Sequence, residues 1–471
     1  MHVVILGAGP AGLAAGYELC SQGGQVTIVE KENQVGGISK TVEREGYRFD
    51  LGGHRFFTKI DEVEELWRET LGEEFLSRPR LSRIYYRNRF FDYPLKPCNA
   101  LFSLGIMESL FIIASYLNAR INPVRPEESF QDWVSNRFGR RLFNHFFKSY
   151  TEKVWGISCT ELKAEWAAQR IKGLSLATAV INAVLGPLKK KNAIKTLIEE
   201  FNYPRLGPGM MYEAIAQKII DRGGRILTDT SAVRICREGE NVKAVEVRSK
   251  TGCGSKIEGD YVISSLPLRD AINMIDPAPA AEIVKAGNQL KYRDFLCVNI
   301  ALQREYLFPD NWIYIHSPEV RLGRVQNFKQ WSPGMVPESG CSSLGLEYFC
   351  NEGDELWRAD DRELISMAVS EVARIGLIKE EWVKWGTVIR VPKAYPVYDE
   401  DYKKSIPLIR EYLKGFNNLL TIGRNGLHRY NNMDHSILTG LLAARNICGG
   451  NYDLWEVNTD DEYHEEARRQ C

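Results

Sequence analysis

Three glycines near the start of the chain have the spacing of a phosphate-binding turn. Gly7, Gly9 and Gly12 fit the pattern G-x-G-x-x-G. In this pattern the first glycine permits a tight turn, the second lets the backbone approach a pyrophosphate, and the third lets a helix meet a strand closely. Glu30 follows at a spacing where its carboxylate can accept hydrogen bonds from ribose hydroxyls. These four residues therefore predict that the chain binds a dinucleotide.

The flanking residues form the elements that such a site requires. Apolar residues over 3–7 predict a strand, the spacing over 13–22 predicts a helix, and residues 25–30 predict a second strand. Together they make a βαβ unit, in which a pyrophosphate faces the unpaired N–H groups at the start of the helix. Gly36 and Gly37 follow the second strand and predict another close approach of the backbone to the dinucleotide.

Composition limits the class of protein. The chain has 471 residues, 44% of them apolar, and its 61 Lys and Arg balance 61 Asp and Glu. This predicts a folded chain of two or three domains with no net charge to attract nucleic acid. Ten cysteines without C-x-x-C spacing argue against a metal site. We see no signal peptide and expect a cytoplasmic protein with free thiols.

Two apolar stretches, 101–117 and 174–188, are interrupted by polar residues or proline. Each falls short of the ~20 clean apolar residues that a membrane-crossing helix needs, so we expect no transmembrane segment. We expect both stretches to be buried helices, and contact with a membrane surface is the alternative. The basic run at 189–195 is expected to be solvated.

The extended glycine pattern resembles the FAD-binding fingerprint of the glutathione-reductase-like flavoproteins. Within them it resembles the branch that holds amine oxidases, protoporphyrinogen oxidases, phytoene desaturases and UDP-galactopyranose mutases. Residues 260–267 and 421–424 also lie where this branch places FAD-contacting segments. The resemblance implies an FAD cofactor held by Gly7, Gly9, Gly12, Glu30, Gly36, Gly37, Gly53, His54, Gly423, Arg424, Met433 and Asp434.

Five ordered motifs are similar to those of the UDP-galactopyranose mutases in particular. They are DLGGHRFF (50–57), SYTEKVWG (149–156), GRVQNFKQWSP (323–333), KAYPV (393–397) and GRNGLHRYNNMDH (423–435). The resemblance implies that the first motif lies against the flavin and the second near the sugar nucleotide. It assigns the catalytic and substrate-binding roles to His54, Trp155, Arg324, Tyr395 and Tyr430. The arginine and the two tyrosines would hold a diphosphate by charge-assisted hydrogen bonds.

These motifs and the coarse pattern of elements predict an α/β fold. We expect a glutathione-reductase-like, FAD-binding Rossmann domain with an inserted helical subdomain and an antiparallel-sheet substrate domain. The FAD-binding domain is expected in segments 1–60, 201–270 and 401–471, and a mainly helical subdomain at 61–200. The substrate domain is expected at 271–400, with strands near 295–303, 311–316, 322–328 and 343–350.

Three functions fit this sequence. The first is a flavoenzyme acting on a diphosphate-linked sugar, a nucleotide sugar used in polysaccharide biosynthesis, with reduced FAD as the nucleophile and NAD(P)H as an external reductant. The second is an FAD-dependent oxidoreductase of the amine oxidase or protoporphyrinogen oxidase type. A paired aromatic cage and a flavin-facing lysine would favour this second function. The third is a catalytically silent FAD protein that binds a partner or a membrane.

Each candidate side chain also has an ordinary structural alternative. His54 could cap a turn, Trp155 could pack in a core, and Arg324, in a strand, could form an ordinary salt bridge. Tyr395 and Tyr430 could be structural hydrogen-bond donors. The sequence leaves both interpretations of each residue open, since motifs indicate the shape of a ligand better than the reaction.

Overall fold

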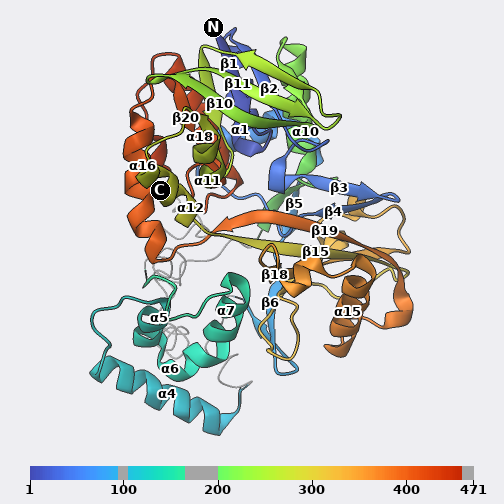
Figure 1. The fold of residues 1–471 in the computed structure, drawn as a ribbon. Helices are drawn as coiled ribbons and strands as arrows, with labels where there is room; N and C mark the ends of the chain where they lie inside the picture. Colours follow the sequence, from blue (N-terminus) through green and yellow to red (C-terminus); the bar gives the residue numbers. More distant parts are fainter. Residues whose placement is uncertain (94–103, 165–199, 459–471) are drawn as a thin grey trace.

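The computed structural model describes residues 1–93, 104–164 and 200–458 (Figure 1). The part of the molecule that contains the parallel sheet lies at the top in this view. We call it the nucleotide-binding half, because it contains the predicted dinucleotide-binding unit. A long, mainly antiparallel sheet lies below it, and a group of helices extends beyond that sheet (Figure 1). The expected α/β fold with one parallel and one antiparallel sheet is confirmed. The expected segment boundaries remain predictions.

The N-terminal, middle and C-terminal parts of the chain meet in one parallel sheet. Its strand order is β20-β13-β1-β2-β9, and every neighbouring pair is parallel. The strands are β1 (His2–Leu6), β2 (Gln25–Val29), β9 (Arg225–Leu227), β13 (Tyr261–Ser264) and β20 (Leu419–Thr421). This order places the two strands of the predicted βαβ unit next to each other, as a dinucleotide-binding unit requires.

Both faces of the parallel sheet are covered. Val3 and Ile5 of β1 pack against helices α1 (Pro10–Ser21), α10 (Gly209–Asp221) and α18 (Met433–Ile447). Val4 and Leu6 point to the other face, where they pack on a second sheet and its helices. All four side chains are fully buried, because helices lie on one side and the second sheet on the other.

The remaining elements around the nucleotide-binding half include the second sheet, the helices that pack on it and the connecting segments. The second sheet has the order β12-β11-β10-β14. The elements are β3 (Thr41–Arg44), β4 (Tyr47–Asp50), α2 (Asp61–Leu71), β8 (Glu200–Pro204), β10 (Thr230–Glu238), β11 (Asn241–Ser249), β12 (Gly254–Glu258), α11 (Leu268–Met274), β14 (Ile275–Asp276), α12 (Ala281–Gln289), α16 (Glu400–Lys414) and α17 (Gly423–Gly426).

The other half of the molecule is built on a seven-stranded sheet with the order β19-β15-β18-β17-β16-β6-β7. We call it the substrate half, because it contains most of the predicted substrate domain. The strands of this sheet are antiparallel except for the parallel pair β6 and β16. The strands are β6 (Ser82–Tyr86), β7 (Arg89–Asp92), β15 (Tyr292–Leu302), β16 (Trp312–Ile315), β17 (Arg324–Asn327), β18 (Ser342–Cys350) and β19 (Val383–Pro396). The four strands predicted here are confirmed, while β19 is additional. Helix α15 (Asp361–Arg374) packs on β15 and β19.

The hairpin β6–β7, together with β5 (Phe75–Pro79), lies in a segment that was expected to be mainly helical. Arg87 and Asn88 join the hairpin, and both have positive φ angles of 49° and 59°. Two-residue hairpin turns of this kind usually carry glycine. Because the turn residues are Arg and Asn and include no glycine, the turn was not recognised from the sequence, and these strands were not predicted.

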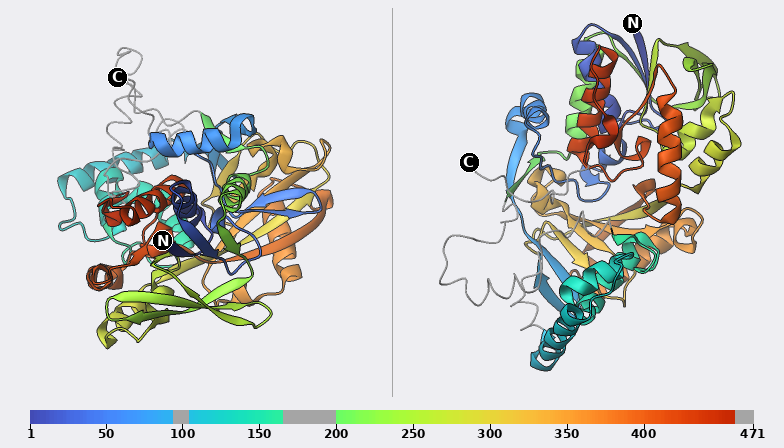
Figure 2. Two further views of the ribbon diagram at one scale, coloured as in Figure 1. Left: turned by 90° about the horizontal axis from the view of Figure 1, so that it is seen from above. Right: turned by 90° about the vertical axis from the view of Figure 1, so that its left-hand side faces the viewer.

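Helices form the part of the substrate half that lies beyond the sheet (Figure 1 and Figure 2). They are α4 (Ile106–Ile121), α5 (Phe130–Phe138), α6 (Arg140–Leu142), the π-helical turn η3 (Phe143–Lys148) and α7 (Ser149–Trp155). Helix α5 begins with a capping box in which Ser129 and Asp132 bond each other's backbone N–H groups. Gly139, with a φ angle of 82°, ends α5 and separates it from α6.

The prediction that the first apolar stretch forms a buried helix is wrong. Helix α4 covers most of it, but among its residues only Ile112 is buried, and Ile106 is 80% exposed. Apolar composition predicted burial, yet no described element covers the outer side of this helix. The second stretch, 174–188, and the basic run 189–195 lie outside the described residues. No helix in the described part of the chain is long and apolar enough to cross a membrane.

Candidate active site

A cavity of about 1110 Å³ lies where the parallel sheet, the large antiparallel sheet and the helical part of the substrate half meet. Most residues singled out from the sequence line it. They are Gly7, Gly9, Glu30, Gly37, Gly53, His54, Trp155, Arg324, Tyr395, Gly423, Arg424, Tyr430, Met433 and Asp434. Two predicted cofactor residues, Gly12 and Gly36, do not line the cavity.

The glycines of the N-terminal turn serve different purposes. A Cβ atom at Gly12 would lie 2.0 Å from the carbonyl oxygen of Gly7, so Gly12 allows helix α1 to pack on the turn. At Gly9 the nearest atom to such a Cβ would be the Gly37 Cα, at 3.9 Å. Since Gly9 also lines the cavity, the space beside it is open to a ligand. This cradle fits the pyrophosphate of a dinucleotide.

Glu30 lies directly after β2 and is almost completely buried. One of its oxygens accepts a hydrogen bond from the Ala8 N–H at 2.7 Å, and the other accepts from the Glu32 N–H at 3.0 Å. The carboxylate thus holds the glycine turn in place. A carboxylate has about four acceptor sites, so it keeps capacity for ribose hydroxyls in the cavity that it lines.

The C-terminal motif closes the other side of the cradle. Gly423 has a φ angle of 77°, and its N–H donates to Oγ1 of Thr439 at 2.9 Å. Helix α18 begins at Met433, and Asn432 precedes it without a side-chain cap. Helix α1 likewise begins without a side-chain cap. The starts of both helices line the cavity, where their N–H groups favour a polar or anionic ligand.

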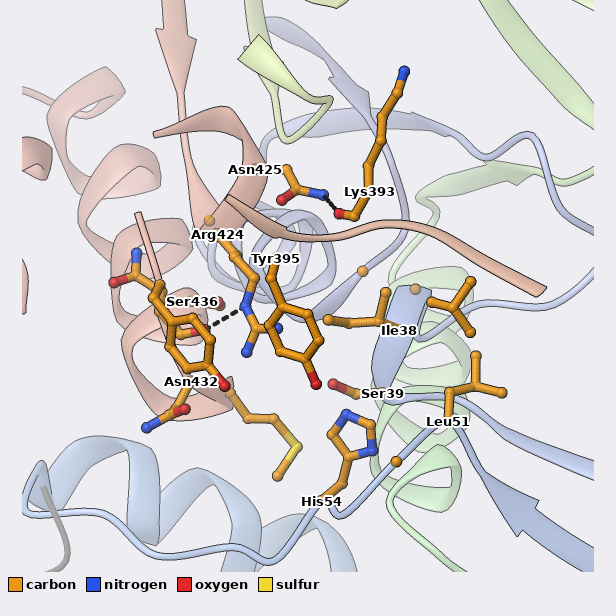
Figure 3. A pocket seen from close by; sticks show the side chains of 18 of the residues that line it. Ile38, Ser39, Leu51, His54, Lys393, Tyr395, Arg424, Asn425, Asn432 and Ser436 are labelled. Atoms are coloured by element: carbon orange, nitrogen blue, oxygen red, sulfur yellow. Dashed lines mark hydrogen bonds between the residues drawn. The ribbon is translucent and has the colours of Figure 1, made fainter. Parts of the chain in front are cut away.

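His54 lines the cavity with Gly53, close to Ser39 in Figure 3. Burial, followed by the positive charges of Arg424 and Arg324, lowers the pKa of His54 to about 3. The imidazole is therefore neutral at physiological pH. It can orient or polarise a ligand, but it carries no positive charge to offer a diphosphate.

Tyr395 and Tyr430 form a parallel pair. Tyr395 lies near the end of β19 and Tyr430 follows α17, yet their ring centroids are 5.5 Å apart with an angle of 9° between the planes. The Arg424 guanidinium carbon lies 4.6 Å from the Tyr430 centroid and 5.6 Å from that of Tyr395. Trp155 approaches both rings at 6.3 and 6.5 Å. The pair thus has a cation and a third aromatic ring beside it.

Arg424 is held by the main chain. Its Nε donates to the carbonyl of Asn431 at 2.8 Å, and its Nη1 donates to that of Ala394 at 3.1 Å. Figure 3 shows this guanidinium behind the Tyr395 ring, with Asn432 and Ser436 on the same side of the cavity. Because both of these hydrogen bonds go to neutral carbonyls, the positive charge of Arg424 can still act on a ligand.

Arg324 is paired with an acid. It lies on β17 directly opposite Glu347 of β18, and the two side chains form a bidentate ion pair with an Nη2–Oε2 distance of 2.6 Å. Glu347 is fully buried and also accepts from Nε2 of Gln326. The salt bridge considered from the sequence is therefore present. Arg324 still lines the cavity, but its charge is largely neutralised.

Lys153 is a residue whose role was not predicted, although it stands in a quoted motif. Its Nζ donates to the carbonyls of Ile315, Ser317, Val320 and Leu322 at 2.9 to 3.1 Å. Burial lowers its pKa to about 8. The lysine thus ties α7 to the loop between β16 and β17, which positions Trp155 at the end of the same helix.

An apolar wall at the substrate end was also not predicted. It consists of side chains from α5, α6 and η3 that line the cavity. They are Phe130, Phe138, Leu142, Phe146 and Phe147. Helical spacing marks such residues as apolar, but it cannot distinguish a core from the wall of a cavity.

The fold, the glycine cradle and the two uncapped helix starts define an FAD-dependent flavoenzyme. The chain belongs to the family described as flavin containing amine oxidoreductase, whose model matches residues 10–448. FAD is its cofactor, and the residues that line the cradle fit this group.

The chain is similar to curated relatives over limited lengths. It is 23% identical to a 4,4'-diapophytoene desaturase (4,4'-diapolycopene-forming) of Methylomonas sp over 64% of this chain and 60% of the relative. It is 42% identical to a phytoene dehydrogenase of Streptomyces griseus over 19% of this chain and 18% of that protein. It is 36% identical to the L-amino acid oxidase Cdc18 of Crotalus durissus cumanensis over 20% and 22%. The matches thus span less than two thirds of these relatives.

Solved structures share the fold over almost the whole chain. Reduced UDP-galactopyranose mutase superimposes with a TM-score of 0.84 at 21% identity, covering 98% of both chains. A protein named as a protoporphyrinogen oxidase from Exiguobacterium sp. 255-15 superimposes with a TM-score of 0.70 at 15% identity, covering 95% of this chain and 98% of that one. The resemblance to this branch of flavoproteins is confirmed.

Proposed function

We propose that this protein is a flavoenzyme that binds a diphosphate-linked sugar and rearranges it without net oxidation. The observation that carries the proposal is the parallel pair of Tyr395 and Tyr430, with the Arg424 guanidinium beside both rings. Two phenol hydroxyls and a cation with neutral partners form a donor set suited to a diphosphate. The similarity in fold to UDP-galactopyranose mutase supports a nucleotide sugar as the ligand.

The roles of the other residues follow from their places in the cavity. Trp155 offers an apolar face near the tyrosine pair, on which a sugar ring can lie. His54 orients the ligand as a neutral imidazole. Arg324 contributes mainly by shaping the cavity that it lines, because its ion pair with Glu347 offsets its positive charge. FAD, once reduced by a donor such as NAD(P)H, supplies an electron-rich ring that can act as a nucleophile.

A second function, an FAD-dependent oxidoreductase, is favoured by two observations. The parallel tyrosines also fit the paired aromatic cage expected of that class, and the neutralised Arg324 weakens the anion site. The other expected feature, a flavin-facing lysine, finds no support in Lys153 or Lys393. Lys153 is committed to four carbonyls, and Lys393 is paired with Asp270. The balance therefore favours the redox-neutral function.

Ligand binding tests the anion site directly. Calorimetric titration of the holoenzyme with UDP should show affinity that falls about tenfold in Tyr395→Phe and in Tyr430→Phe, since each loses one hydrogen bond to a charged group. Tyr452→Phe, at an exposed position, is the matched control and should bind as the unmodified protein does. Equal affinity for UDP in all four proteins would contradict the proposed site.

A further inference from the structure

Helix α4 exposes a continuous apolar stripe on its outer side. Ile106, Leu110, Ile113, Leu117 and Ile121 follow one another at helical spacing and are 80, 56, 42, 54 and 77% exposed. We call these five residues the α4 stripe. Figure 1 shows α4 at the outer edge of the helical part, on the side away from the parallel sheet. Large exposed apolar patches of this kind mark contact surfaces.

The opposite side of α4 is fixed to the rest of the molecule by polar contacts. Glu108 pairs with Arg141 at 2.5 Å and with His145 at 2.7 Å, and the Ser115 hydroxyl accepts from the Arg141 N–H. A Cβ atom at Gly139 would lie 2.7 Å from the Tyr116 backbone nitrogen, so the two backbones are in close contact. The stripe thus faces outward because its helix is locked in this orientation.

Exposed basic side chains lie on α4 itself, in the segment that follows it and at the start of α6. Arg120, Arg125 and Arg140 are exposed, and none of them makes an ion pair with a residue that the structure describes. The acidic residue within α4, Glu108, is turned inward and neutralised. An apolar helical face accompanied by basic side chains is the pattern of helices that lie in the plane of a lipid surface.

We propose that the α4 stripe docks on an anionic lipid bilayer and seats this enzyme at a membrane surface. A two-fold dimer through the same face would gather two copies of Arg120, Arg125 and Arg140 around one interface, while Glu108, the acidic residue of α4, is already paired within its own chain. Anionic headgroups, in contrast, complement these arginines while the stripe enters the region between headgroups and acyl chains. Charge complementarity therefore selects the lipid surface over a second copy.

Docking through the α4 stripe also agrees with the position of the cavity's apolar wall. Helix α4 packs on α5 and α6. Phe130, Phe138 and Leu142 of those helices line the apolar wall of the cavity. Docking would therefore bring the apolar end of the cavity towards the lipid. The proposal depends on α4 alone, so it stands or falls independently of the reaction proposed above.

Vesicle sedimentation of the holoenzyme tests the proposal. Vesicles of about three parts phosphatidylcholine to one part phosphatidylglycerol should bind the protein, and pure phosphatidylcholine should bind it several-fold more weakly. Leu110→Gln/Leu117→Gln should weaken binding at least about tenfold, because two side chains no longer enter the lipid. Arg120→Gln/Arg125→Gln should weaken binding to the anionic vesicles alone, by about fivefold for each arginine.

Ile220→Gln/Leu408→Gln is the matched control, since these positions are 49 and 48% exposed on other elements. It should sediment as the unmodified protein does. Flavin content, measured in every variant, confirms that each is folded. The proposal is overturned if the protein ignores both kinds of vesicle, or if Leu110→Gln/Leu117→Gln binds them unchanged. It is also overturned if light scattering shows a dimer that this variant dissolves.

Discussion

The two ends of the cavity are built in different ways. At the cofactor end, the cavity is lined by the glycine turn and the start of α1, where Gly7 and Gly9 offer mainly backbone to a ligand. At the proposed substrate end, the lining consists of side chains from separate elements, such as Tyr395 on β19 and Trp155 on α7. A backbone site depends on local conformation and thus on residue spacing. A side-chain site depends on how distant elements pack, so the two ends should respond differently to substitution.

The largest effect is expected at the cofactor end, from Gly9→Val. The new side chain has room within the protein, since the nearest atom to a Cβ would be 3.9 Å away, but it occupies the cradle. We expect FAD binding to weaken by at least about a hundredfold. The ratio of flavin absorbance to protein absorbance after purification measures this loss.

Gly254→Val is the control for that experiment. Gly254 lies on the exposed strand β12, where a Cβ would have only an ordinary contact at 3.8 Å. This variant should keep its full FAD content. A Gly9→Val protein that is folded and fully yellow would show that the cradle does not hold the pyrophosphate.

At the substrate end, removing one partner of a buried pair should damage stability. Arg324→Ala leaves the carboxylate of Glu347 fully buried without its main partner. Breaking such a pair typically costs ~3–5 kcal/mol of the free energy of unfolding. Chemical denaturation of the holoenzyme measures this change.

The double variant Arg324→Ala/Glu347→Gln sharpens the comparison between the two ends. It removes the unpaired charge and should recover more than half of the lost stability, with FAD content unchanged. If Arg324→Ala alone is as stable as the unmodified protein, the ion pair with Arg324 is not needed to stabilise the buried carboxylate of Glu347. Arg324 would then be available to a ligand, as the sequence suggested.

A smaller effect concerns His428, a fully buried histidine just after α17. Burial is the main cause that lowers the pKa of His428 to about 4, from 6.5. Between these values the unfolded chain binds a proton at this site and the folded protein does not, so the free energy of unfolding falls as pH falls. His428→Gln should remove about 1.4 kcal/mol per pH unit from that slope.

Denaturation curves of both proteins between about pH 4.5 and pH 6 measure the difference in slope. Asp50 works in the opposite direction, because burial raises its pKa to about 7, but it contributes equally to both proteins. Tyr452→Phe should leave the slope unchanged. Parallel curves for His428→Gln and the unmodified protein would mean that His428 takes up its proton in the folded state.

The same contrast explains what the sequence could and could not predict. Gly7, Gly9 and Glu30 lie within one βαβ unit, so their spacing was enough to predict both the fold of that unit and its ligand. The pairing of Arg324 with Glu347 depends on the register between β17 and β18, which no local pattern encodes. The function of Lys153 likewise depends on a loop far away in the sequence.

Helix composition was informative but not sufficient. Helices α1 and α4 are both largely apolar, and the sequence predicted burial for the stretch that α4 mostly covers. Helix α1 lies between the parallel sheet and α18, whereas no described element covers the outer side of α4. Apolar spacing predicts that a helix has an apolar face, but only the fold shows whether another element packs against that face.

Anaerobic mixing of the oxidised holoenzyme with UDP-galactopyranose tests the central claim most directly. The flavin absorbance near about 450 nm reports its redox state. A redox-neutral enzyme should show a small spectral shift on binding and no bleaching, and it should convert the sugar nucleotide only after reduction, with the flavin still reduced at the end. Rapid bleaching of the oxidised flavin with stoichiometric oxidation of the sugar nucleotide would contradict the account and identify an oxidoreductase.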